Sequence, residues 1–188
     1  DLYGRLHKCD FLRREVDYLG FRVGETGIGT DPSKVQDVVD WPRPSSVKDV
    51  RSFIGLASFY RRFIRHFSLI AKPLTDLTKK LAPWKWGQKE ERAFLQLKVA
   101  LVKAPVLAIP DMDRPFILTT DASLVSVGAI LQQESADGIH PVAFASRKLN
   151  PTEARYSAYE RELLAIVWAI GQWRPYLETL PFTEIGRA

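Results

Sequence analysis

The sequence contains few of the residues that build disulfide frameworks or metal clusters. Its one cysteine is Cys9, and its three histidines are His7, His66 and His140. A lone cysteine excludes an internal disulfide and favours the reducing interior of a cell, and so few Cys and His residues argue against a zinc site. The longest apolar run, 163–170, is too short to span a membrane. We therefore expect an intracellular protein that does not bind a membrane.

The composition is that of a globular protein. With 188 residues, of which 46% are hydrophobic and 26% are charged, the chain is long enough for one large or two small domains. The sequence begins at Asp1 without an initiator methionine or an apolar leader. We expect a globular piece of a longer chain.

Basic residues are concentrated in one part of the chain. Lys and Arg number 27 against 22 Asp and Glu, which gives a net charge of +5. Residues 43–80 contain nine Lys and Arg, opposed only by Asp49 and Asp76. A local basic excess favours a polyanionic partner such as nucleic acid, although a solvated helix face would have the same composition.

The first half of the chain predicts a β-hairpin followed by helices. Residues 11–24 alternate in part around Gly20, which indicates a strand pair, and 24–29 reads as a turn. Asp31 and Pro32 provide an N-cap and a first helical residue for a short helix. A longer helix is predicted over 46–66, and another over 88–103.

The 46–66 helix is predicted to carry two different stripes. The first stripe is apolar and faces the core. The second has basic residues at both ends and small residues in the middle: Lys48, Arg51, Gly55, Ser58, Arg62 and Arg65. Glycine lets a backbone approach a duplex closely, and flanking cations meet phosphates, so this stripe predicts binding to nucleic acid without sequence preference.

The second half predicts an α+β unit. Strands are expected at 116–120, 127–132 and 141–146, and Ser157 with Glu160 forms a capping box that opens a long helix through about Trp173. Asp121 ends the first of these strands, and Glu162 lies one turn inside the helix. Such carboxylates suit Mg²⁺, and two ions can stabilise both oxygens of a phosphodiester exchange.

Ordinary structural explanations compete with this metal hypothesis. An Asp after a strand is commonly a turn former or a helix cap, and a helix Glu is commonly solvated. Glu160 is an alternative ligand, but its place in the capping box already explains it. Spacing alone therefore leaves the Asp121 and Glu162 pair undecided.

An ordered series of short motifs resembles a known family. The motifs are Lys8–Phe11, Tyr18–Phe21, Asp31–Val35, Trp41–Pro44, Arg51–Leu56, Tyr60–Ile64, Ala71–Thr75, Ala104–Leu107, Thr120–Ser123, Tyr156–Ser157 and Glu162–Ile166. Together they resemble the Pol polyprotein of gypsy-class LTR retrotransposons, over nearly the whole chain up to about Leu177.

The resemblance implies roles for particular residues. Tyr18, Leu19, Gly20 and Phe21 match the primer grip of a reverse transcriptase. Arg51, Gly55 and Phe59 match a helix that follows the minor groove of the primer–template. Asp121 and Glu162 match the first two RNase H carboxylates, which hold Mg²⁺ or Mn²⁺ in the family.

The resemblance also implies a division of the chain. Residues 1–30 match the edge of the palm with its hairpin, 31–80 a helical thumb, 81–115 a connecting helix and linker, and 116–188 the N-terminal half of an RNase H-like domain. The fold expected is α+β, with an incomplete three-strand sheet and one long helix. The polymerase carboxylates are absent, and the 184–188 ending replaces the third RNase H ligand, with Glu184 too early to substitute for it.

The leading hypothesis is a reverse transcriptase fragment that binds an RNA–DNA hybrid or DNA duplex and is inactive alone, with or without a bound metal. Its partners would be the rest of the Pol polyprotein, in the cytoplasm, a retroelement particle or the nucleus. We also expect self-association through Trp168, Ile170 and Trp173, because half a sheet leaves apolar surface open. Two alternatives stay open: a domesticated, non-catalytic nucleic-acid-binding or assembly module, and a decayed, inactive product.

Overall fold

The computed structural model describes residues 11–186, so the candidate motif at Lys8, Cys9 and Asp10 lies largely outside the described residues. The chain begins with a small antiparallel sheet of β1 (Glu15–Tyr18), β2 (Phe21–Gly24) and β3 (Gly27–Thr30). The expected hairpin is present, but β3 occupies part of the segment predicted as a turn. The turn between β1 and β2 places Leu19 and Gly20 at positive φ, 50° and 80°.

A helical bundle follows the small sheet. Its elements are α1 (Pro32–Val39), α2 (Val47–Phe59), the 3₁₀ turn η2 (Arg61–Phe63), α3 (Phe67–Ile70), α4 (Lys72–Leu77) and α5 (Gln88–Val102). The predicted N-cap is confirmed, because the Asp31 side chain accepts a hydrogen bond from the Ser33 amide at the start of α1. The ring centroids of Phe53 in α2 and Phe94 in α5 lie 4.6 Å apart, so the bundle core is centred between these two helices.

The predicted 46–66 helix is wrong at its C-terminal end, because α2 stops at Phe59. The fully buried Tyr60 donates its hydroxyl to the Gly20 carbonyl, forty residues away, at 2.8 Å. The chain then forms η2 and passes through His66 in the left-handed region, with φ of 55°. Tertiary contacts have overridden the helical period here, so Arg62 and Arg65 do not continue the α2 stripe.

The second half of the chain is built on a larger, mixed sheet. Its strands are β4 (Ile117–Ala122), β5 (Ser126–Ser135), β6 (Gly138–Lys148) and β7 (Thr183–Gly186), in the order β6-β5-β4-β7. The helical elements are η3 (Glu153–Arg155), α6 (Ala158–Gln172) and α7 (Arg174–Leu177). The predicted α+β class is confirmed, but the sheet has a fourth strand, because β7 pairs in parallel with β4.

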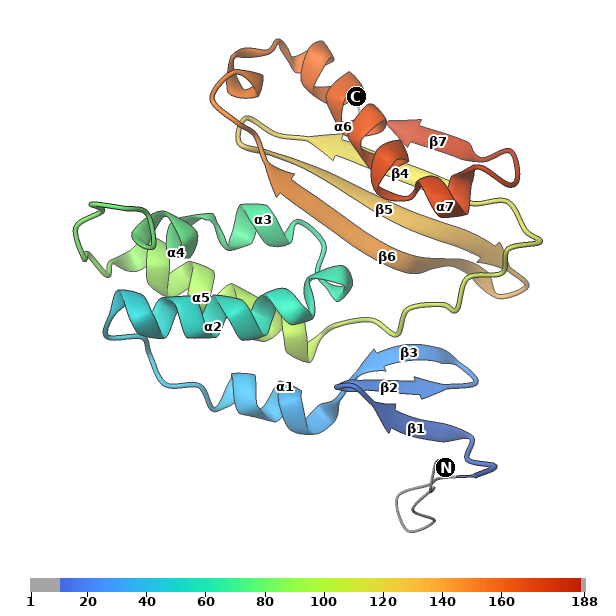
Figure 1. Cartoon of the computed structure of the whole chain (residues 1–188), viewed down its shortest axis with the longest axis horizontal. Coiled ribbons are helices and arrows are strands. Elements are labelled where there is room, and N and C mark those ends of the chain that lie inside the picture. Colours follow the sequence, from blue (N-terminus) through green and yellow to red (C-terminus); the bar gives the residue numbers. More distant parts are fainter. Residues whose placement is uncertain (1–10, 187–188) are drawn as a thin grey trace, which may run out of the picture.

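The larger sheet is packed against helices on one face and against the helical bundle at strand β6. Figure 1 shows α6 and α7 lying over one face, and the helical bundle lying beside β6. On the bundle side, Ser68 donates both its amide and its hydroxyl to Ser146 of β6, at 2.9 and 2.8 Å. Arg61 donates to the same Ser146 carbonyl at 2.8 Å. These contacts fix the bundle against the sheet edge.

Helix α6 begins as predicted but exposes different residues. The capping box is present: Ser157 accepts from the Glu160 amide, and the Glu160 carboxylate accepts from the Ser157 amide. The expectation that Trp168, Ile170 and Trp173 form an exposed surface is wrong, because Trp173 is buried in the sheet core and the other two are half-buried. The exposed apolar side chains of α6 are Tyr159, Leu163 and Val167.

No helix within residues 11–186 is long and apolar enough to cross a membrane.

Candidate nucleic-acid interface and carboxylate site

The outer side of α2 is an open stripe, defined here as Lys48, Arg51, Gly55, Ser58 and Phe59. The α-helical period places these residues on neighbouring turns of one side. All are exposed except Ser58, which is half-buried. A Cβ atom added at Gly55 would meet nothing within 4 Å, so the backbone itself forms the surface at the middle of the stripe. Arg51 is partly anchored, because its guanidinium donates to the Thr78 carbonyl at 3.2 Å.

The hairpin turn of the small sheet lies at one end of this stripe. Phe59 stacks on Phe21, with ring centroids 4.9 Å apart and 14° between the planes. A Cβ atom at Gly20 would lie 3.1 Å from the Phe59 ring, so glycine permits this close approach. Tyr18 and Leu19 stay exposed beside it. The four primer-grip candidates therefore adjoin the stripe.

Tyr60 holds this junction together. Burial, and secondarily the negative charges of Asp31 and Asp37, raise the pKa of its hydroxyl to about 12. The hydroxyl therefore stays protonated at neutral pH and can keep donating to the Gly20 carbonyl. The hairpin turn and the end of α2 are joined by a bond that ordinary pH changes do not break.

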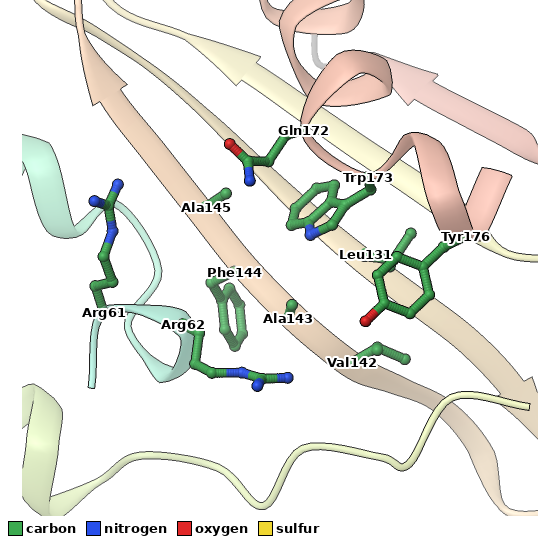
Figure 2. Close-up of a pocket in the computed structure, with 10 residues that line it drawn as sticks. All are labelled: Arg61, Arg62, Leu131, Val142, Ala143, Phe144, Ala145, Gln172, Trp173 and Tyr176. Atoms are coloured by element: carbon green, nitrogen blue, oxygen red, sulfur yellow. The ribbon is translucent and has the colours of Figure 1, made fainter. Parts of the chain in front are cut away.

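Arg62 and Arg65 face the larger sheet and not the stripe. Arg65 donates from Nε to Nε2 of His66 at 3.0 Å. Arg62 reaches from η2 into a cavity beside β6, as Figure 2 shows. Its Nε is buried and has no hydrogen-bond partner within the described residues. The six predicted stripe residues therefore divide into two groups, one on α2 and one between the bundle and the sheet.

Asp121 lies near the end of β4, opposite Gly128 of β5. Nδ1 of His66, from the helical bundle, lies 3.8 Å from Oδ2 of Asp121. A Cβ atom at Gly128 would come within 3.1 Å of that same nitrogen, so a larger residue would push the imidazole away. Sequence reasoning missed this neighbour, because the 54 intervening residues carry no local signal of the contact.

Glu162 lies in the first turns of α6, close enough to Asp121 for the two charges to interact. Burial first, and then the charge of Asp121, raise the pKa of the Glu162 carboxyl, and a hydrogen bond from the Ala122 amide partly opposes the shift. Its Oε2 is buried with no hydrogen-bond partner among residues 11–186. A buried carboxylate oxygen without a donor, beside a second carboxylate, fits a cation.

A third carboxylate does not complete the pair. Glu184 of β7 accepts from the Thr120 hydroxyl at 2.9 Å, and it stands opposite Leu118 in the parallel register. Glu160 is occupied by the capping box. Within residues 11–186 no group of three or more His, Cys, Asp or Glu side chains has the geometry to hold a metal ion.

Comparisons with known proteins agree with this architecture. A model of the RNase H-like domain found in reverse transcriptase matches residues 86–183. The chain is 44% identical over 174 residues to the Retrovirus-related Pol polyprotein from transposon 297 of Drosophila melanogaster, covering 92% of this chain and 16% of that protein. It is 42% identical over 182 residues to the Pol polyprotein from transposon gypsy of the same organism, covering 90% and 17%. The chain thus spans less than a fifth of these relatives.

Solved structures share the fold. A foamy viral protease-reverse transcriptase in complex with dsDNA superposes with a TM-score of 0.83 at 27% identity, over 97% of this chain and 38% of that one. The same viral enzyme in complex with an RNA/DNA hybrid superposes with a TM-score of 0.81, over 97% and 25%. The family model covers more than half of the chain. The chain therefore belongs to the family of RNase H-like domains found in reverse transcriptase, and it is a retroelement fragment of the kind that the gypsy resemblance predicted.

Proposed function

We propose that this fragment binds primer–template duplex through the α2 stripe and the adjoining Tyr18–Phe21 turn. In this proposal, residues 1–30 are the palm edge, 31–80 the thumb, 81–115 a connection, and 116–188 the start of the RNase H-like domain. The observation that carries the proposal is the open backbone at Gly55, flanked by Arg51 on one side and by Phe59 and the hairpin turn on the other. The complexes of the foamy viral enzyme with dsDNA and with an RNA/DNA hybrid support it.

Each part of the surface has a physical role in this proposal. Lys48 and Arg51 neutralise backbone phosphates, which gives affinity without sequence preference. Gly55 lets the helix backbone approach the groove, and Phe59 presents an exposed ring next to it. The turn at Leu19 and Gly20 would meet the strand end nearest the palm.

We further propose that Asp121 and Glu162 hold Mg²⁺ or Mn²⁺ in the parent protein. The unpartnered Oε2 of Glu162 next to the charge of Asp121 supports this assignment. A divalent ion bound there would supply a positive charge for a phosphodiester oxygen. Two carboxylates alone define the position of two ions poorly, so we propose that this chain by itself is inactive in RNA–DNA cleavage and in polymerisation.

The duplex proposal is tested by titrating the chain with a DNA duplex and an RNA–DNA hybrid of several sequences across a salt series. We expect all sequences to bind alike, with log affinity falling linearly with log salt by about 0.9 per phosphate neutralised on B-DNA. Arg51→Ala should reduce that slope by roughly one. The matched control Arg155→Ala, which removes an exposed arginine of η3, should leave the slope unchanged. An unchanged slope in Arg51→Ala would refute the proposal.

A further inference from the structure

Strand β6 is one edge of the larger sheet, and other parts of the chain donate hydrogen bonds to its outer side at two places. At one end the Ala108 amide donates to the Pro141 carbonyl at 2.8 Å, and at the other Arg61 and Ser68 donate to the Ser146 carbonyl. The four residues between them, 142–145, span about 13 Å of strand. This short gap is too small for an added β-strand and large enough for one chemical group with its neighbours.

A cavity of about 440 Å³ lies at this gap. We call it the edge-strand pocket, and its polar and aromatic lining comes from Arg61, Arg62, Phe144, Gln172, Trp173 and Tyr176. Figure 2 shows Arg62 entering from η2, while Gln172, Trp173 and Tyr176 come from the end of α6 and from α7. Its volume lies within the range of roughly 300–1,000 Å³ that small-molecule sites occupy.

The pocket is rich in donors and contains no acid. Two arginines line it and no Asp or Glu does. The Nε of Arg62 is buried without an acceptor in the described part of the chain, although leaving a charged donor unsatisfied is costly. The side chain of Gln172 is exposed and that of Tyr176 is half-buried, and neither forms a hydrogen bond with another residue of 11–186. Phe144 shares the strand alternation of Ser146, so its backbone amide faces outward into the gap.

We propose that the edge-strand pocket binds the phosphate group of a nucleotide or of a nucleic-acid strand, with Arg62 as its main ligand. A guanidinium fork matches the paired oxygens of a phosphate, and the amides of Gln172 and Phe144 supply further donors. The remaining volume accommodates an adjoining sugar or base beside the Tyr176 ring. Arg62 comes three residues after Phe59 in the sequence but faces the larger sheet. The nucleic-acid source of the phosphate rests on the function proposed above, whereas the phosphate site does not.

The probes are inorganic phosphate, dAMP and a short oligothymidylate, titrated into the full chain. Binding is followed by calorimetry and by the NMR signals of the Arg62 Nε–H and the Trp173 indole N–H. We expect saturable shifts of both signals with dAMP or the oligomer, and affinity roughly tenfold to a hundredfold weaker in Arg62→Gln, the loss expected for one charge-assisted hydrogen bond. Shifts with inorganic phosphate alone would also support the site and would identify free phosphate as its source.

Arg155→Gln is the matched control, and it should bind each probe as the wild type does. Arg62→Lys keeps the charge but removes the Nε donor, so it should recover only part of the affinity and serves if Arg62→Gln fails to fold. In the absence of ligand, Arg62→Gln should be at least as stable as the wild type, because it removes an unsatisfied buried donor. If Arg62 were kept only for folding, Arg62→Gln would be less stable than the wild type.

Two results would overturn the proposal. The first is that no probe shifts the Arg62 or Trp173 signals, and the second is that Arg62→Gln binds every probe with wild-type affinity. Duplex titrations separate this inference from the stripe proposal, because Arg51→Ala tests the stripe and Arg62→Gln tests the pocket. Loss of duplex affinity in the first variant with no phosphate binding at Arg62 would leave the proposed function standing and would remove the pocket.

Discussion

Helices α2 and α6 are similar in length and construction but present opposite outer faces. They have 13 and 15 residues, and each begins at a serine N-cap, Ser46 and Ser157. The outer face of α2 carries cations and a bare glycine backbone. The outer face of α6 carries Tyr159, Leu163 and Val167, which are 79%, 51% and 61% exposed. Similar local rules thus produce one face suited to a polyanion and one suited to apolar contact.

The largest expected effect is the loss of duplex affinity when the cations on the outer face of α2 are reversed. Lys48→Glu combined with Arg51→Glu replaces two phosphate-binding cations by repelling charges, so we expect duplex affinity to fall roughly a hundredfold at moderate salt. The control pair is Lys89→Glu with Arg92→Glu, which has the same spacing on the exposed side of α5. Fluorescence anisotropy with a labelled duplex measures both. A similar loss of duplex affinity in the two double variants would show that net charge alone matters, and it would contradict the assignment of the stripe as the binding surface.

The apolar face should govern association of the isolated chain. Burying exposed Leu and Val surface between two copies is favourable, so we expect wild-type self-association at tens of micromolar. Leu163→Glu with Val167→Glu should weaken it by roughly tenfold or more, because it would bury charge. Sedimentation velocity gives the association constant. Leu95→Glu with Val99→Glu on α5 is the control of equal spacing and similar exposure, and a monodisperse wild-type monomer would contradict the prediction.

A smaller effect concerns the ion cluster that joins the helical bundle to β6. Burial opposes ionisation of Asp76, but hydrogen bonds from Lys72 and Lys79 and the charge of Lys148 outweigh it and lower its pKa to about 2. A depressed carboxyl pKa adds stability above the unfolded value of 3.8, and that stability is lost as pH falls from about 4 to 2.

Asp76→Asn should therefore lower the free energy of unfolding by about 1 kcal/mol at neutral pH, after allowance for solvent screening, and by little near pH 2. Denaturant titrations at several pH values measure the difference. A constant difference across that range would assign the loss to packing and not to charge.

The smallest effect concerns Glu162. Burial and Asp121 raise its pKa, so the ionised carboxylate destabilises the fold above its usual pKa of 4.5, and the penalty disappears below that pH. Glu162→Gln should raise stability on the order of 1 kcal/mol or less at pH 7 and not at pH 4. Mg²⁺ or Mn²⁺ should raise the melting temperature of the wild type more than that of the variant. Equal shifts in both would contradict the assignment of Glu162 as a ligand.

The sequence predicted those parts of the fold that depend on local chemistry. The start of α1 follows from Asp31 and Pro32, and the start of α6 follows from Ser157 and Glu160, because each cap lies within a few residues of the amide that it satisfies. The end of α2 was not predictable in this way. It is set by the bond from Tyr60 to Gly20 across 40 residues, which no period in the sequence reveals.

The residues of the candidate site also divide into those placed by local helical spacing and those placed by tertiary contacts. Lys48, Arg51 and Gly55 share a face because of helical spacing alone, so the sequence placed them correctly relative to one another. The approach of His66 to Asp121 and the entry of Arg62 into the edge-strand pocket depend on how the bundle meets the sheet. Strand β7 was missed for a similar reason, because its partner β4 lies some 60 residues earlier.

The most direct test of the proposed duplex surface compares Gly55→Leu with Gly171→Leu. Each replaces an exposed helical glycine that has nothing within 4 Å of its Cβ position, so each should stabilise its own helix by a similar amount. Duplex titrations across a salt series measure both variants, once circular dichroism has shown that they are folded. We expect the duplex affinity of Gly55→Leu to be at least about tenfold weaker than that of the wild type, because the leucine holds the helix backbone off the groove. Its salt slope should be nearly unchanged, because the charge is retained. Gly171→Leu should match the wild type. Equal duplex affinity in the wild type and Gly55→Leu would contradict the account.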